Sequence, residues 1–367
     1  MVIRPLAGAL LLAIAAGCAQ GADKPDARVF DAQVFDAREF PDAVQLPDGM
    51  VVTPPDAAIG LDAAGPACAT TTADFTNSTS TPIPDLDTLT STLDVTGLPT
   101  FLGKLTVTTH ITHQYPPDLE ILLITPTGAR VRLTADNGEA DNSFDGTVWT
   151  DAADANAIDY LYLTTPATEL APETPLGALF GSDPNGTWTL SVLDDAGSDT
   201  GTLASWTLSF TTFAQTPDLE LLSVGSSTSH PINDNSTVSD ALNLGSIGMP
   251  ICKVAVTTQI QHTFAGDLLV SLIDPAAHRI KLSEYFGTDY DDVFLGTQWR
   301  DDAGDSVTDH SFASDGVVTP LAPYYGLGAE FGNDAAGTWT LEVHDDAGSD
   351  VGSLQGWTLD LTGCSCP

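Results

Sequence analysis

The sequence predicts an all-β protein with two tandem jelly-roll antiparallel β-sandwiches after a disordered N-terminal tether. Three observations predict this: a long internal duplication, period-two alternation of apolar residues, and frequent Gly, Pro, Asp and Asn clusters between short segments. Residues 186–208 read GTWTLSVLDDAGSDTGTLASWTL, and residues 337–359 read GTWTLEVHDDAGSDVGSLQGWTL. Matching residues lie 151 positions apart, from 186 to 337. This offset far exceeds the ~20–50 residues of a solenoid repeat, so the chain holds two copies of one whole domain.

The N-terminus predicts export. Residues 1–18 contain one Arg, a short apolar run and small residues before Cys18. The run is too short to span a bilayer, so it is typical of a secretory signal. The small residues before the Cys resemble a bacterial lipoprotein processing site, which would make Cys18 the lipidated N-terminus of a cell-envelope or outer-membrane lipoprotein. Ordinary cleavage to a soluble secreted protein stays open, and any membrane attachment is expected only through this anchor.

Residues 19–67 predict a disordered linker. Steps such as Pro-Asp-Ala and Phe-Asp-Ala recur there, with single scattered apolar residues. Such a composition cannot bury a core, so we expect a spacer.

The rest of the chain predicts strands. Residues 104–113 alternate and place Leu, Val, Thr, Ile and finally His113 on one face, and residues 253–262 repeat this face and end at His262. Copy one is expected to span residues 74–213 and copy two residues 218–363. We expect the six tryptophans to pack in the two cores, with Trp149 and Trp299 as the two that could instead face a ligand.

Four cysteines remain after the signal: Cys68, Cys252, Cys364 and Cys366. An even number in an exported chain indicates two disulfides, with three connectivities in principle. Cys364 and Cys366 are too close to pair comfortably with each other. A complete intramolecular pairing would therefore join Cys68 to copy two. A free or intermolecular Cys68 stays open.

The formal net charge of −39 is extreme. Such a surface repels the phosphates of nucleic acids and anionic lipids, so we expect no binding to nucleic acids. Two interpretations remain, a soluble acidic surface and carboxylates partly neutralised by divalent cations.

Several motifs recur in the same order in both copies. A His precedes Asp-Leu and a strand that ends before Pro, an acidic segment follows a Phe, and Gly-Thr-Trp-Thr-Leu, an Asp-rich turn and Trp-x-Leu close the pattern. Together they resemble the P domain, also called the Homo B domain, of proprotein convertases and bacterial subtilisin-like serine proteases. The resemblance covers nearly all of residues 74–363 and implies a jelly-roll β-sandwich for each copy.

The resemblance also frames the function. In that family the domain usually follows a subtilisin-like catalytic domain, and here we find no matching nucleophile segment. We therefore expect no enzyme and no catalytic residue, but a non-catalytic surface protein for binding or scaffolding. Its expected partner is an unknown protein, with a subtilisin-like protease acting in trans as one candidate. The alternatives are a calcium-dependent carbohydrate-binding or adhesion module with a glycan partner, and a component of serine-type endopeptidase activity.

Clustered carboxylates are the candidate metal ligands, and calcium in a structural role is the expected cofactor. Calcium takes about six to eight oxygen ligands from a bent loop, although Asp and Gly are also ordinary turn residues. The Asp-rich turns supply one set, and the resemblance implies that the Asp before Leu acts with the later acidic segment. The candidates in copy one are Asp118, Asp151, Asp194, Asp195 and Asp199. Those in copy two are Asp267, Asp301, Asp345, Asp346 and Asp350.

Overall fold

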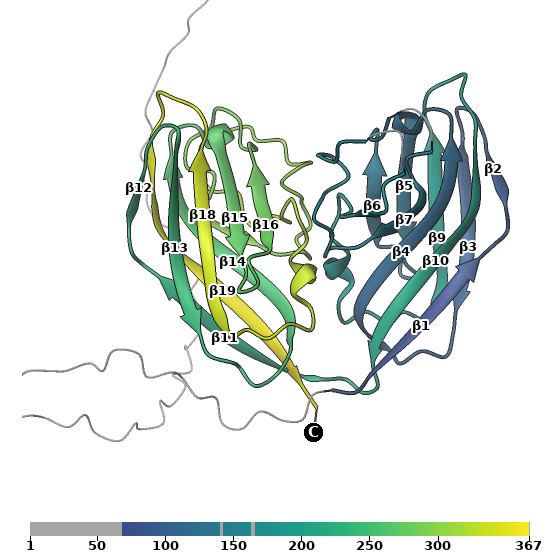
Figure 1. The fold of residues 1–367 in the computed structure, drawn as a ribbon, viewed down its shortest axis with the longest axis horizontal. Helices are drawn as coiled ribbons and strands as arrows, with labels where there is room; N and C mark the ends of the chain where they lie inside the picture. Colours follow the sequence, from purple (N-terminus) through teal and green to yellow (C-terminus); the bar gives the residue numbers. More distant parts are fainter. Residues whose placement is uncertain (1–67, 140–141, 163–165, 367) are drawn as a thin grey trace, which may run out of the picture. The chain divides into compact units, whose positions relative to one another are not determined.

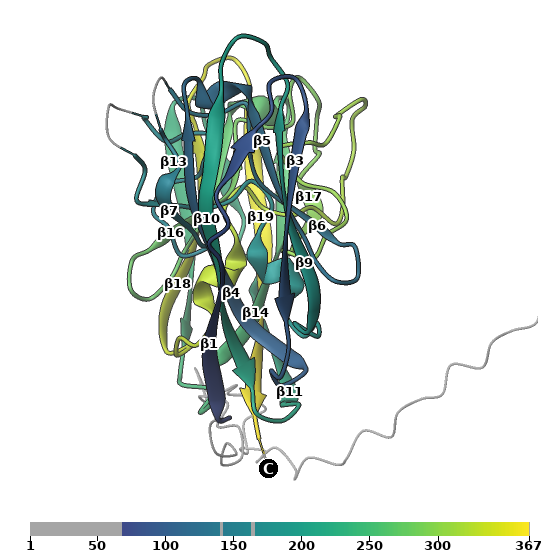
Figure 2. The same cartoon turned by 90° about the vertical axis from the view of Figure 1, so that its right-hand side faces the viewer.

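The computed structural model describes residues 68–139, 142–162 and 166–366, which form two β-sandwiches (Figures 1 and 2). These residues contain strands and four short 3-10 helices, and no α-helix. None of their helices is long and apolar enough to cross a membrane. The predicted signal peptide, the lipidation site Cys18 and the linker 19–67 lie outside the described residues.

Sandwich 1 consists of two sheets. One has the strand order β1-β10-β4-β7-β8, with β2 also paired to β10, and the other has the order β3-β9-β5-β6. All pairs are antiparallel except β7 with β8. The elements are β1 (Thr70–Asn77), β2 (Thr81–Ile83), β3 (Thr88–Val95), β4 (Phe101–His113), η1 (Pro116–Asp118), β5 (Leu119–Ile124), β6 (Arg130–Ala135), β7 (Asp145–Trp149), β8 (Glu169–Leu170), η2 (Leu176–Leu179), β9 (Gly186–Asp194) and β10 (Gly201–Phe213).

Sandwich 2 repeats this arrangement. Its sheets have the orders β11-β19-β14-β17, with β12 also paired to β19, and β13-β18-β15-β16. Its elements are β11 (Asp218–Ser226), β12 (His230–Ile232), β13 (Ser236–Leu244), β14 (Ile251–His262), η3 (Ala265–Asp267), β15 (Leu268–Ile273), β16 (Arg279–Glu284), β17 (Leu295–Trp299), η4 (Leu327–Glu330), β18 (Gly337–Asp345) and β19 (Gly352–Ser365). The predicted fold class, an all-β protein with two sandwiches, is confirmed.

The buried faces follow the predicted alternation. In β4 the residues that point inward end at His113, and in β14 they end at His262; both histidines are almost fully buried. Because successive side chains of a strand point to opposite faces, one polar residue with the inward parity is carried into the core. That parity is why each histidine lies at a buried end of its sheet.

All six tryptophans are buried in the cores. Trp149 and Trp299, which could have faced a ligand, are fully buried, and their indole N–H groups donate to Thr109 Oγ1 at 2.9 Å and Thr258 Oγ1 at 3.0 Å. The ligand-facing interpretation of these two residues is therefore wrong. Each indole ring satisfies its one hydrogen-bond donor inside the core.

Two disulfides join the cysteines. Cys68, just before β1, is bonded to Cys366, just after β19, and Cys252 is bonded to Cys364 within sandwich 2. The Cys68–Cys366 bond thus links the beginning of one sandwich to the end of the other. Around the cysteines packs a cluster of phenylalanines from both sandwiches, namely Phe101, Phe180, Phe213 and Phe331.

Candidate functional site

The predicted carboxylates gather in part at one end of each sandwich. In sandwich 1, Asp118 ends η1, while Asp194 ends β9 and begins the Asp-rich turn; the backbone N–H of Asp195 donates to the carbonyl of Asp118 at 3.0 Å. We call Asp118, Asp194, Asp195 and Asp199 the acidic end of sandwich 1. Burial raises the pKa of Asp118, and the charges of Asp194 and Asp199 raise it further. These carboxylates therefore repel one another across the end of the sandwich.

Sandwich 2 has the same acidic end, formed by Asp267, Asp345, Asp346 and Asp350. Burial raises the pKa of Asp267, and the charges of Asp345 and Asp350 raise it further. The repetition follows from topology, since η3 and the β18–β19 turn take the places of η1 and the β9–β10 turn.

Each acidic end holds a buried His–Asp pair. His113 Nε2 lies 3.1 Å from Asp194 Oδ2, and both side chains are fully buried. The backbone N–H of Tyr115 donates to His113 Nδ1 at 3.2 Å, so Nδ1 is an acceptor and Nε2 carries the proton. His262 Nε2 lies 3.2 Å from Asp345 Oδ2 in the same way. These histidines thus anchor the first aspartate of each Asp-rich turn.

The two acidic ends differ in one oxygen. Asp345 Oδ1 accepts from the backbone N–H of Ala347 at 3.0 Å, whereas Asp194 Oδ1 is buried without a hydrogen-bond partner in the structure. A buried carboxylate oxygen is costly without a donor or cation, so Asp194 Oδ1 is the strongest sign of a ligand here. Neither acidic end brings three ligand atoms within 4.8 Å of one another in the described residues.

Asp151 and Asp301 lie elsewhere. β7 pairs antiparallel with β4, so that Val107 lies beside Trp149. Asp151 therefore lies near Lys104, at the beginning of β4, whereas His113 is at the other end of that strand. The combination of Asp118 with Asp151 that the family resemblance implies is therefore not formed, and Asp267 with Asp301 is separated by the same register in sandwich 2.

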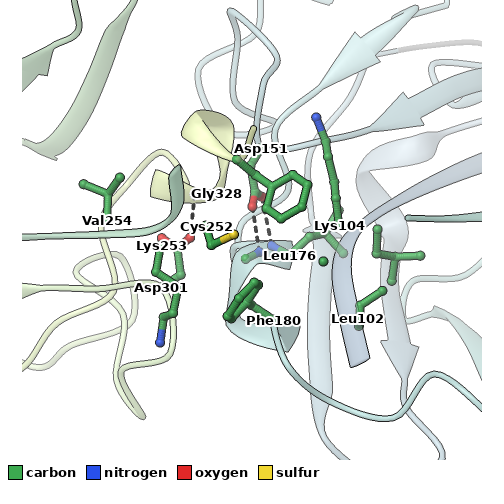
Figure 3. Close-up of a pocket in the computed structure, with 14 residues that line it drawn as sticks. Leu102, Lys104, Asp151, Leu176, Phe180, Cys252, Lys253, Val254, Asp301 and Gly328 are labelled. Atoms are coloured by element: carbon green, nitrogen blue, oxygen red, sulfur yellow. Dashed lines mark hydrogen bonds between the residues drawn. The ribbon is translucent and has the colours of Figure 1, made fainter. Parts of the chain in front are cut away.

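These two aspartates instead meet where the sandwiches contact each other (Figure 3). Asp151 accepts from the backbone N–H groups of Leu176 at 2.8 Å and Gly177 at 2.7 Å, both in η2. Asp301 accepts from Leu327 at 2.8 Å and Gly328 at 2.7 Å, both in η4. Each carboxylate thus holds the 3-10 helix of its own sandwich against the other sandwich.

The contact requires glycine in both 3-10 helices. A Cβ at Gly177 would collide with Asp301 Oδ2 and come within 3.1 Å of Gly328 Cα; a Cβ at Gly328 would collide with Asp151 Oδ2 and come within 3.0 Å of Gly177 Cα. Between them remains a cavity of about 20 Å³, also lined by Lys104 and Lys253 (Figure 3). This is space for about one water.

Burial of the pair alters its protonation. Burial raises the pKa of Asp151 to about 6, although the N–H groups of Leu176 and Gly177 and the charge of Lys104 act in the opposite direction. Burial, and next the charge of Asp151, raises the pKa of Asp301 well above its ordinary value. The two carboxylates therefore resist carrying two negative charges at once.

Polar contacts across the interface surround this pair. Asn156, fully buried in sandwich 1, donates from its backbone N–H to Tyr325 Oη at 3.0 Å and from Nδ2 to the Tyr324 carbonyl at 2.9 Å. Lys281 Nζ contacts Asp159 at 2.7 Å. Ala153 and Ala171 of sandwich 1 pack into the core cluster of sandwich 2. Sequence reasoning missed this interface, because no periodicity within one copy marks a residue that packs against the other.

Comparisons with known proteins agree with this description. The chain is 34% identical over 131 residues to a protein named "Calcium-dependent protease" from Nostoc sp., and likewise to one of the same name from Trichormus variabilis. These matches cover 36% of the chain and 17% of each relative, so the chain spans about a sixth of their length.

Solved structures of a serine protease of Aeromonas sobria also match at 20% identity. The complex with its chaperone has a TM-score of 0.28 and covers 41% of this chain and 28% of that one. The protease alone has a TM-score of 0.26 and covers 39% and 27%.

A family described as proprotein convertase P-domain matches residues 102–210, inside sandwich 1, and residues 251–361, inside sandwich 2. The two matches together cover more than half of the 367 residues. The chain belongs to the proprotein convertase P-domain family.

Proposed function

We propose that this chain is an exported, non-catalytic binding module that presents two P domains in one fixed orientation to a subtilisin-like serine protease. The observation that carries the proposal is the interface between the sandwiches. Reciprocal glycine contacts, the Asn156–Tyr325 hydrogen bond and the Cys68–Cys366 disulfide hold the two copies together. A pair fixed in this way loses little conformational freedom when both copies bind, which favours a preorganised platform over two independent modules.

The non-catalytic assignment rests on the family and on the buried polar groups. P domains are the non-catalytic part of the proteases that contain them, and the relatives are about twice as long as this chain. In the part of the chain that the structure describes, the four cysteines are in disulfides and the buried histidines bond aspartates. A protease needs a hydroxyl or thiol activated by such a histidine.

Calcium at the acidic ends forms part of the proposal. Two relatives carry the name calcium-dependent protease, and each acidic end supplies oxygen ligands alone, including the unpartnered Asp194 Oδ1. The ion would draw the carboxylates around itself and offset their mutual repulsion. The proposed role is structural, to fix the Asp-rich turn.

The proposed location is the bacterial cell envelope, through a lipid on Cys18, or the medium after secretion. Two disulfides in the described residues are compatible with export to an oxidising compartment. The glycan-binding alternative is weakened by the burial of Trp149 and Trp299, because sugars commonly stack on exposed aromatic rings.

Binding is tested with a subtilisin-like catalytic domain from which its own P domain has been removed. Calorimetric titration with this chain should give saturable binding, and the mixture should keep more peptidase activity after heating than the catalytic domain alone. The same protease with its own P domain is the matched control and should gain little. Absence of binding and of protection would reject the partner, and peptide hydrolysis by this chain alone would reject the non-catalytic assignment.

Calcium is tested separately by thermal unfolding with the ion and with a chelator. We expect calcium to raise Tm by several degrees, and Asp118→Ala with Asp267→Ala to remove the rise. An unchanged Tm in the unaltered chain would mean that the acidic ends are solvated turns.

A further inference from the structure

Three side chains in sandwich 2 form a compact cluster away from the acidic ends. Asp274 directly follows strand β15, His278 precedes β16, and Glu330 ends η4. Each offers one ligand atom, and these atoms all lie within 4.8 Å of one another; among the described residues no other group of three does so. Asp274 is 5% exposed and Glu330 is 1% exposed, so the cluster is largely removed from water.

Sandwich 1 has the same backbone at this place without the cluster. The backbone N–H of Thr125 donates to the Ala129 carbonyl at 2.9 Å, and that of Asp274 donates to the His278 carbonyl at 3.1 Å. Thr125 Oγ1 accepts from the Ala129 N–H at 3.0 Å, as Asp274 Oδ1 accepts from the His278 N–H at 2.7 Å. The position of Glu330 is occupied by Leu179, which is buried in the apolar core.

The turn therefore needs none of the three chemical groups of sandwich 2. A hydroxyl, a methyl group and an isobutyl group suffice for the same backbone in sandwich 1. All three positions carry metal-ligating groups in sandwich 2, where burying two carboxyl groups side by side costs free energy unless a cation or a proton lies between them.

The carboxyl groups of Glu330 and Asp274 lie within hydrogen-bonding reach of each other, so a proton or a cation is needed between them, and two atoms of the cluster have no other hydrogen bond. Glu330 Oε1 and His278 Nε2 are both buried without a hydrogen bond, whereas Glu330 Oε2 accepts from Asn333 Nδ2 at 3.1 Å. A buried polar atom without a partner is rare and marks an unfilled interaction. Glu330 thus holds one oxygen in place through Asn333 and leaves the other free inside the cluster.

We propose that Asp274, His278 and Glu330 bind one zinc ion in sandwich 2. An imidazole nitrogen with two carboxylates is a donor set that suits Zn²⁺, while calcium prefers oxygen ligands alone. Asp154 Oδ1 of sandwich 1 lies 3.8 Å from His278 Nε2 and is near enough to supply the fourth ligand. Bound zinc would therefore connect the hairpin of sandwich 2, its 3-10 helix η4 and sandwich 1.

The test is equilibrium dialysis of the tag-free, chelator-stripped full chain against zinc chloride, followed by metal analysis. We expect one zinc per chain, retained in a large excess of calcium. The matched variant carries Asp274→Thr, His278→Ala and Glu330→Leu, which are the residues of sandwich 1 at these positions and should preserve the fold. It should lose one zinc, while an Asp118→Ala variant should keep it. A Tm increase with zinc in the unaltered chain, absent from the triple variant, is the second readout.

Other results would overturn the proposal. Equal zinc binding by the triple variant would place the ion elsewhere. In a second outcome the unaltered chain binds no zinc although it is folded as well as the triple variant. If Glu330→Leu then also raised Tm, a shared proton, and not a metal ion, would neutralise the two carboxyl groups. Displacement of the zinc by equimolar calcium would contradict the histidine as a ligand.

Discussion

The two sandwiches have the same strand order apart from the additional β8 of sandwich 1, yet they differ sharply where the hairpin meets the 3-10 helix. Sandwich 1 closes this place with Thr125, Ala129 and Leu179, and sandwich 2 with a buried, under-bonded cluster of two acids and a histidine. The acidic ends, in contrast, carry the same aspartates and the same His–Asp pair in both, and differ in one hydrogen bond of the turn. The shared backbone thus carries the acidic end in both sandwiches and the cluster of two acids and a histidine in sandwich 2 alone. Such single-copy polar groups point to an added role more strongly than the duplicated ones.

The largest effect is expected from separating the two sandwiches. Cys68→Ser with Cys366→Ser removes the disulfide between them and should cost about 4 kcal/mol, since the bond closes a very long loop. Differential scanning calorimetry should then resolve two transitions in place of one. In the matched variant, Cys252→Ser with Cys364→Ser, the lost bond lies within sandwich 2, and only that sandwich should be weakened. A single transition shifted equally in both variants would contradict this difference.

The fold could be predicted from the sequence because its signal is local. Alternation in residues 104–113 and 253–262 identifies which side chains point inward, and the duplication indicates two copies of one domain. The burial of His113 follows from the same alternation, whereas its pairing with Asp194, which ends a strand of the other sheet, does not.

The interface could not be predicted in the same way. The meeting of Asp151 with Asp301 depends on how one sandwich packs on the other, and a pattern within one copy carries no such information. The cluster around Glu330 did leave a signal. Aligning the two copies shows the buried Leu179 replaced by Glu and the exposed Ala129 replaced by His. A buried apolar position rarely becomes charged without a partner.

The next largest effect concerns pH at the interface. The pKa of Asp151 rises from an ordinary value of about 3.9 to about 6 in the folded chain, so the folded state binds the proton more tightly. This contribution to stability is present at about pH 4 and is lost as pH rises through about 6, in total about 3 kcal/mol. Other charged groups also act on this pair. Lys104 lies near Asp151, and Asp302, which is ion-paired with Lys253, lies near Asp301.

Tm measured from pH 5 to pH 8 should therefore fall with rising pH. Burial also raises the pKa of Glu173 and Glu330 to about 7, which adds to the same slope. Asp301→Asn removes a buried carboxyl group whose pKa is itself raised well above its ordinary value by burial and by the charge of Asp151, so the slope should become shallower. Asp199→Asn, at the acidic end, is the control. An identical slope in both variants would show that the buried pair does not titrate in this range.

A smaller effect is expected from filling the glycine contact. In Gly328→Ala the new methyl group meets Asp151 and the backbone of Gly177, and overpacking of this kind costs about 2 kcal/mol. Gly245→Ala is the matched control, since a Cβ there meets nothing within 4 Å. Urea unfolding should separate the two variants. Equal midpoints would mean that the 3-10 helices are not pressed together in solution.

The smallest effect returns to the acidic ends and distinguishes one copy from the other. In Asp345→Asn an amide N–H₂ group can face the backbone N–H of Ala347, and two opposed donors cost about 1 kcal/mol or more. In Asp194→Asn the amide takes the place of Oδ1, which has no donor to oppose, so the cost without calcium should be lower.

Calcium should reverse this order. An oxygen without a donor is available to a cation, so Asp194→Asn should lose more of the calcium-dependent rise in Tm than Asp345→Asn. The measurement is Tm of both variants with calcium and with a chelator. The same ranking in both conditions would mean that Asp194 Oδ1 is not a ligand, and the difference between the two copies at this end would then be a matter of hydrogen bonding in the turn alone.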